Sequence, residues 1–128
     1  MRLLLDTHVF IWWDSSPEKL SPQARAACQN RKNVVLFSAA SAWEMQIKMQ
    51  LGKLRLRLAL RDLIEQQQQA NDIQVLPLTL RHVLALQELP VYHSDPFDRI
   101  LIAQAHAEDA TLITHDPAFT KYPVEILW

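Results

Sequence analysis

Short apolar strands alternate with longer helical segments along the sequence, and this order constrains the fold more than any other feature. The expected strands are residues 2–5, 34–37, 73–76, 111–114 and an edge strand at 124–127. The expected helices are residues 7–13, 22–30, 39–50, 60–70, 79–89 and 96–108. Strands linked through helices favour a parallel sheet that is covered on both faces. The sequence therefore predicts an α/β fold, a three-layer α/β/α sandwich with a central, mostly parallel sheet.

Length and composition predict one domain over residues 1–128, because the chain is long enough for one core and too short for two. The single glycine excludes the glycine-rich loops of nucleotide-binding folds. Cys28 stands alone, which excludes a disulfide framework and a cysteine metal site. No secretion signal and no apolar run of membrane-helix length is visible. We therefore expect a cytoplasmic protein with no membrane partner.

Aromatic residues give two predictions about packing. In the helix at 39–50, Trp43, Ile47 and Leu51 follow one another at intervals of four residues, which predicts a buried stripe. Trp12 and Trp13 are adjacent, and two neighbouring indoles cannot both point inward from a helix that packs on one face. Either one of them lies at an interface, or their helix is buried on most sides.

Acidic residues lie at or near the carboxyl ends of the predicted strands. Asp6 ends the first strand, Asp116 follows the fourth, and Glu44 lies within two turns after the second. Asp98 is the third residue of the helix that Asp95 opens. Sites in open α/β sheets form beyond these strand ends, so we expect the acids to meet there. Clustered carboxylates repel one another unless a cation lies between them, and hard cations prefer oxygen ligands. The pattern therefore predicts a Mg²⁺ or Mn²⁺ site.

Each acid also has an ordinary structural interpretation. Asp98 occupies a position where the helix dipole favours a carboxylate and where it can complete a capping box. Asp116 precedes a proline and can cap a helical turn. Glu44 can pair with Lys48 one turn later. Asp6 is harder to explain in this way, because a charge at the tip of an apolar strand is costly without a partner.

Four segments of the chain together resemble the PIN-domain nucleases, and specifically the VapC-like toxins of type II toxin–antitoxin pairs. They are LLLDTHVFIWW from Leu3, SAASAWEMQIKMQLGKL from Ser38, HSDPFDRILIAQA from His93 and LITHDPAF from Leu112. The resemblance implies a PIN-like fold and a hydrolase, an endoribonuclease that depends on Mg²⁺ or Mn²⁺. It also implies an RNA substrate, a small VapB-like antitoxin as partner, and a homodimer.

Matching the family motifs position by position assigns roles to particular residues. The acids that match the catalytic motifs are Asp6, Glu44, Asp98 and Asp116. Asp6 and Asp98 are expected to be the metal ligands. The supporting residues are expected to be Thr7, Asp95 and Thr114. Thr7 is placed to bond a carboxylate or phosphate, Thr114 to support the acids, and Asp95 to serve as a helix N-cap more than as an outer ligand.

Substrate binding needs positive charge, and the formal net charge of −1 gives no general support for a nucleic-acid partner. A local stretch without acids contains the basic residues Lys48, Lys53, Arg55, Arg57 and Arg61. It fits either a phosphate-binding patch or a solvated face with ordinary ion pairs. Lys48 and Arg99 are the expected substrate-binding residues. His8 and His93 are interpreted as supporting hydrogen-bond groups.

Two other functions remain open. A phosphatase with an aspartyl nucleophile at Asp6 would want a second acid two residues later, and that position holds His8. A catalytically silent binding module would use the acids only to cap helices. Titration with a divalent metal separates such a module from a nuclease.

Overall fold

The computed structural model describes residues 1–128 and contains a five-stranded sheet in the order β3-β2-β1-β4-β5. The strands are β1 (Arg2–Leu5), β2 (Val34–Ser38), β3 (Gln74–Leu76), β4 (Thr111–Ile113) and β5 (Ile126–Leu127). Every neighbouring pair is parallel. β1 lies at the centre, so its carboxyl end is flanked by the ends of β2 and β4. The predicted parallel sheet is confirmed.

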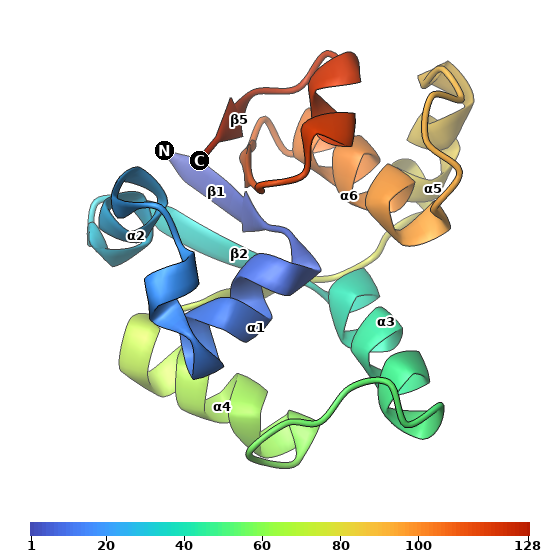
Figure 1. The fold of residues 1–128 in the computed structure, drawn as a ribbon. Coiled ribbons are helices and arrows are strands. Elements are labelled where there is room, and N and C mark those ends of the chain that lie inside the picture. The colour runs from blue at the N-terminus through green and yellow to red at the C-terminus, as the bar shows by residue number, and fades with distance from the viewer.

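Helices cover both faces of this sheet (Figure 1). They are α1 (Thr7–Ser15), α2 (Pro22–Gln29), α3 (Ala39–Gln50), α4 (Leu60–Asn71), α5 (Leu80–Ala85) and α6 (Pro96–Ala107). Short 3₁₀ turns are η1 (Pro17–Lys19), η2 (Leu86–Glu88) and η3 (Pro117–Lys121). α1, α2 and α4 pack on one face and α5 and α6 on the other. The predicted three-layer sandwich is confirmed, and none of its helices has the length and apolar character needed to cross a membrane.

Burial of the central strand β1 fixes the position of Asp6, the residue that follows it. Leu3 and Leu5 point into one core cluster, and Leu4 points into the cluster on the opposite face. All three side chains are fully buried, and each such burial contributes roughly 1.5–3 kcal/mol. Phe10 of α1 stacks on Phe37 of β2 with ring centroids 4.0 Å apart. The end of β1 is therefore anchored on both sides of the sheet.

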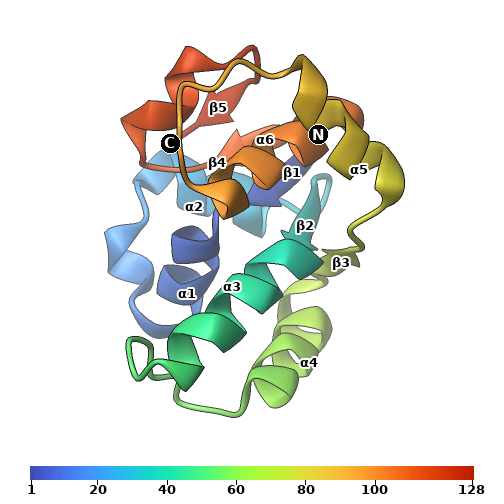
Figure 2. The ribbon, with the colours of Figure 1, turned by 90° about the vertical axis from the view of Figure 1, so that its right-hand side faces the viewer.

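Helix α3 corrects the prediction of a buried aromatic stripe. Trp43 and Leu51 are 59% and 62% exposed, so the predicted stripe is wrong. The buried positions of the helix are instead Ala40, Ser41, Glu44 and Met45. The reason is that α3 lies between the two helical layers at the carboxyl edge of the sheet, where small and polar side chains are buried beside one large apolar side chain, Met45 (Figure 2). Hydrophobic periodicity cannot identify such a face.

The adjacent tryptophans of α1 are both partly buried against the core on the α1 side. Trp12 also packs edge-on against Trp128, with centroids 6.1 Å apart. This packing accounts for both indoles within the chain, as expected of a helix that is buried on most sides. The alternative of an indole at an interface stays a prediction.

Candidate active site

Asp6 lies at the first position beyond β1, where its backbone N–H still donates to Ile113 O at 3.0 Å. Its carboxylate is buried and accepts a hydrogen bond from Thr114 Oγ1 at 2.8 Å. Thr114 Oγ1 in turn accepts the backbone N–H of Asp116 at 3.1 Å. The exposed side chain of His8 lies beside the same carboxylate, and its pKa is raised mainly by hydrogen bonding to Asp6. Thr114 therefore links Asp6 to the segment that carries Asp116.

Glu44 is buried on α3, and both of its carboxylate oxygens have partners. Thr7 Oγ1 donates to Oε1 at 2.8 Å and also lies 2.9 Å from Ser41 Oγ. Lys48 Nζ lies 2.9 Å from Oε2, in the pair that the spacing of four residues predicted. Ser41 was not among the predicted site residues. The signal that could have found it is its position three residues before Glu44, on the same helix face.

The start of α6 separates the roles of Asp95 and Asp98. Asp95 is the N-cap, and its Oδ1 accepts the backbone N–H groups of Phe97 at 2.8 Å and Asp98 at 3.1 Å. The capping box predicted with Asp98 does not form, because the Asp95 backbone N–H donates to His93 Nδ1 instead, at 3.3 Å. The Asp98 carboxylate is thus left facing the other acids rather than its own helix terminus. Its Oδ2 lies 2.8 Å from His93 Nε2.

Asp116 has the capping role that its position before Pro117 suggested, and it also faces the site. Its Oδ1 accepts the backbone N–H of Ala118 at 2.9 Å, at the start of η3. Ligand-type atoms of Asp116, Asp98 and His93 all lie within 4.8 Å of one another. Helix capping and participation in the cluster are therefore compatible for this residue.

Burial and the neighbouring acids both affect the pKa of Asp98. The pKa of Asp98 is raised to about 7, first by burial and then by the negative charges of Asp95 and Asp6. Glu44 adds a smaller contribution of the same sign, whereas His93 opposes it. A carboxylate in such surroundings is hard to ionise unless positive charge is brought to it.

The predicted basic residues are not all directed to the acids. Arg99 is partly buried and its guanidinium approaches Leu89 O at 3.5 Å, with no ion pair to the acidic cluster. In the basic stretch, Arg57 pairs with Asp14 at 2.7 Å. The exposed residues of that stretch without an ion pair are Lys53, Arg55 and Arg61. Arg57 thus forms an ordinary ion pair, whereas phosphate binding by the rest of the stretch and substrate contacts by Lys48 and Arg99 stay predictions.

Comparison with known proteins identifies the family of this chain. The family model described as PIN domain matches residues 3–125, which is most of the chain. The chain belongs to the PIN domain family. A curated relative, Ribonuclease VapC22 of Mycobacterium tuberculosis (strain ATCC 25618 / H37Rv), is 30% identical over 115 residues, covering 89% of this chain and 86% of that protein. The family resemblance found in the sequence is confirmed.

Solved structures show the same fold. VapBC2 from Rickettsia felis, bound to a DNA fragment from their promoter, aligns with a TM-score of 0.70 at 16% identity, over 99% of this chain and 98% of that chain. VapBC-1 from nontypeable Haemophilus influenzae aligns with a TM-score of 0.64 at 18% identity, over 99% and 97% of the two chains. At these identities the likeness establishes the PIN fold, which the sequence predicted.

The side chains of this PIN domain fit a divalent cation. The carboxylates of Asp98 and Asp116 lie within 4.8 Å of each other, and the charges of Asp6 and Glu44 act on Asp98. Carboxylates are hard oxygen ligands of the kind that Mg²⁺ and Mn²⁺ prefer. The pKa of Asp98 is raised first by burial and then by the neighbouring carboxylates, and a bound cation would offset both effects. In the group that Asp98 and Asp116 form, the nitrogen atom comes from His93.

Proposed function

We propose that this PIN domain is an endoribonuclease, the toxin of a toxin–antitoxin pair, and that it hydrolyses RNA phosphodiester bonds with Mg²⁺ or Mn²⁺. The observation that carries the proposal is the close approach of Asp98 and Asp116, within 4.8 Å, beside two further acids, Asp6 and Glu44, whose charges act on Asp98. Burial and these charges together raise the pKa of Asp98. Membership of the PIN family and a curated relative named as a ribonuclease support the same activity.

In the proposed mechanism, Asp6 and Asp98 are the principal metal ligands, and Glu44 and Asp116 complete the set or accept a proton from the attacking water. A bound divalent cation supplies a water of lowered pKa and stabilises the charge that develops on the phosphate. Thr114 holds the orientation of Asp6 through its 2.8 Å hydrogen bond.

Two neighbouring side chains fix the orientation of the Glu44 carboxylate and balance its charge. Thr7 fixes one of its oxygens and Lys48 balances its charge at the other. Lys48 is only partly buried, so its ammonium group can also approach an RNA phosphate, and Arg99 is the second residue proposed for this contact. Thr7 and Asp95 act as supporting residues, the first on Glu44 and the second at the start of α6.

The proposed partners follow from the same family. The solved neighbours described above are VapBC proteins, and we propose a VapB-like antitoxin as the inhibitor of this chain. A homodimer, a single domain over residues 1–128 and a cytoplasmic location stay predictions from the sequence.

The decisive experiment incubates the purified protein with RNA in the presence of Mg²⁺, of Mn²⁺, or of excess chelator. Cleavage is expected with either cation and is expected to stop in chelator. RNA that is cut equally well in chelator would contradict the metal mechanism. An intact RNA in all three conditions would contradict the ribonuclease itself, and a phosphoenzyme trapped on Asp6 would then favour the phosphatase alternative.

A further inference from the structure

The ring of His93 is fixed in one protonation pattern by the backbone. His93 Nδ1 accepts the backbone N–H of Asp95 at 3.3 Å, so this nitrogen uses its lone pair and carries no proton. A neutral imidazole has one N–H group, which must therefore be on Nε2. The conclusion does not depend on the protonation state of the neighbouring carboxyl group, because a ring without any N–H would be an imidazolate.

The protonated nitrogen faces Asp98. His93 Nε2 is buried and makes no hydrogen bond elsewhere. It lies 2.8 Å from Asp98 Oδ2, in a contact that is close but not well aligned for a hydrogen bond. A nitrogen that carries a proton has no lone pair for a cation, so it can act only as a donor to the carboxylate.

The same chain segment that presents Asp116 also holds His93 in place. Asp116 begins η3, and Tyr122, the residue that follows this turn, is buried. The Tyr122 hydroxyl accepts the backbone N–H groups of Tyr92 at 3.1 Å and His93 at 2.9 Å. Phe119 of η3 packs edge-on against the imidazole, with centroids 6.3 Å apart. The ring is therefore positioned by backbone bonds and an aromatic contact, independently of Asp98.

We propose that His93 is a positioning residue of the metal site and not itself a ligand. Its Nε2, which has no hydrogen-bond partner in this structure and lies 2.8 Å from Asp98 Oδ2, donates to that oxygen when a cation binds beside Asp98, which leaves the other oxygen of Asp98 for the cation. The inference rests on the proposed function only in assuming that a divalent cation binds beside Asp98. Ligating carboxylates elsewhere depend on such outer hydrogen bonds, and their loss typically weakens metal binding 10–100-fold, on the order of 1–3 kcal/mol.

Two substitutions separate this role from a merely structural one. In His93→Gln the side-chain amide N–H replaces the Nε2–H donor, whereas in His93→Asn the amide oxygen replaces only the Nδ1 acceptor for Asp95. Mn²⁺ binding is followed by electron paramagnetic resonance of the free ion. We expect His93→Gln to bind Mn²⁺ nearly as the original chain does, and His93→Asn to bind it about 10-fold more weakly. The reverse order would show that His93 only holds the loop, and would overturn the proposal.

The protonation pattern itself is measured by long-range ¹H–¹⁵N spectroscopy of the imidazole, without Mg²⁺ and with saturating Mg²⁺. We expect the proton on Nε2 in both states. A shift of the proton to Nδ1 when Mg²⁺ binds would make His93 a ligand and overturn the proposal. His106→Gln is the control, because His106 is exposed on the last turn of α6 and should leave Mn²⁺ binding unchanged.

Neither readout requires RNA cleavage. A protein that binds Mn²⁺ in the expected order but leaves RNA intact would contradict the proposed function and support the role of His93. If the original chain cuts RNA and His93→Asn binds Mn²⁺ normally, the proposed function is supported and the role of His93 is contradicted. Thermal unfolding of both variants confirms that the comparison is made between folded proteins.

Discussion

Two histidine–carboxylate pairs in this chain have similar distances between nitrogen and oxygen but opposite surroundings. His82 Nε2 lies 3.0 Å from Glu108 Oε2, and His93 Nε2 lies 2.8 Å from Asp98 Oδ2. In each histidine, Nδ1 accepts a backbone N–H, at 3.1 Å in the first and 3.3 Å in the second. The pairs differ in what lies around the carboxylate.

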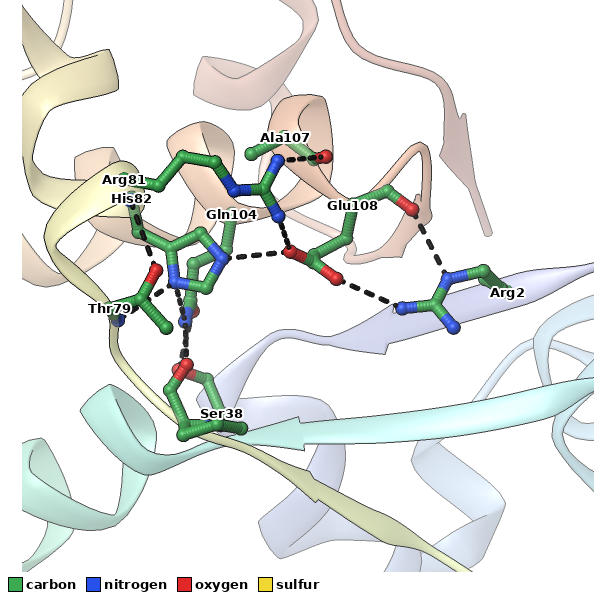
Figure 3. A network of polar contacts seen from close by, with 9 residues as sticks. Arg2, Ser38, Thr79, Arg81, His82, Gln104, Ala107 and Glu108 are labelled. Carbon is green, nitrogen blue, oxygen red and sulfur yellow. Dashed lines mark hydrogen bonds and ion pairs between the residues drawn. The ribbon is translucent and has the colours of Figure 1, made fainter.

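Glu108 is surrounded by positive charge (Figure 3). Arg2 Nη2 lies 3.2 Å from Oε1, and Arg81 forms an ion pair with Oε2. The pKa of Glu108 is lowered, chiefly by the hydrogen bond to His82 and then by the arginines, although burial opposes this. Asp98 instead faces other acids, and its pKa is raised. The charge of Glu108 is thus balanced by cations of the chain itself. The charge of Asp98 is not balanced in this way, and an external cation would stabilise it.

The largest expected difference between the pairs is in catalysis. Asp98→Asn keeps the shape and removes the charge, so RNA cleavage should fall roughly 1,000-fold, equivalent to about 4 kcal/mol of lost transition-state stabilisation. Glu108→Gln, the matched change in the other pair, should leave the rate per folded molecule unchanged. The measurement is the rate of RNA cleavage in saturating Mg²⁺. An Asp98→Asn variant with full activity would refute the assignment of the site.

A divalent cation should stabilise the folded chain through Asp98 and not through Glu108. Adding Mg²⁺ at about 100 times its dissociation constant should raise the free energy of unfolding by about 2.7 kcal/mol, because the cation binds only the folded acids. The measurement is urea denaturation with and without chelator. Glu108→Gln should keep this response, whereas Asp98→Asn should lose most of it. An Asp98→Asn variant that responds to Mg²⁺ as fully as the original chain would place the metal elsewhere.

Without metal, stability should depend on Glu108 more than on Asp98. Glu108→Gln removes the anion that His82 and two arginines share, and His82 is only 1% exposed. Loss of this partner should cost roughly 1–2 kcal/mol, reduced by solvent at the exposed arginines. Urea denaturation in chelator at about pH 7 gives the value. A variant as stable as the original chain would mean that the network contributes little beyond packing.

The smallest effect expected is a difference in pH dependence. Because the pKa of Asp98 is about 7 in the folded chain, above its ordinary value, the folded chain keeps a proton that the unfolded chain has lost between about pH 4 and pH 7. In chelator, the free energy of unfolding should therefore fall as pH rises through this window.

The Asp98→Asn variant should lack that part of the slope, which pH-dependent urea denaturation can measure. Glu108 should act in the opposite sense, because its pKa is lowered: its contribution is present above the ordinary pKa of glutamate and is lost as pH falls through the folded-state value. An unchanged slope in Asp98→Asn would mean that another acid carries the repulsion.

Local sequence signals predicted much of the fold. The expected strand at 2–5 coincides with β1, and Ser21 caps α2 by accepting the backbone N–H of Ala24 at 3.0 Å. The segment expected to be an edge strand at 124–127 is shorter in the structure, where β5 spans Ile126–Leu127. Apolar runs and N-caps act within a few residues, which is why they can be read without knowledge of the fold.

The site was predicted only in part. The acids could be named because residues that follow parallel strands share one edge of the sheet. The pairing of His93 with Asp98 could not, because it depends on the Tyr122 hydroxyl that holds the preceding loop from the far end of the chain. The wrong prediction for Trp43 has a related cause, since α3 packs a polar face into the site.

The sequence by itself determined that a parallel sheet gathers acids at one edge, because chain direction and strand order follow from local patterns and connection rules. Only the tertiary structure decided which carboxylates are balanced by cations of the chain and which are not. Arg2 and Arg81 reach Glu108 from β1 and α5, and no such residue reaches Asp98. That difference arises because side-chain contacts between distant segments depend on register and helix packing, which no local pattern records.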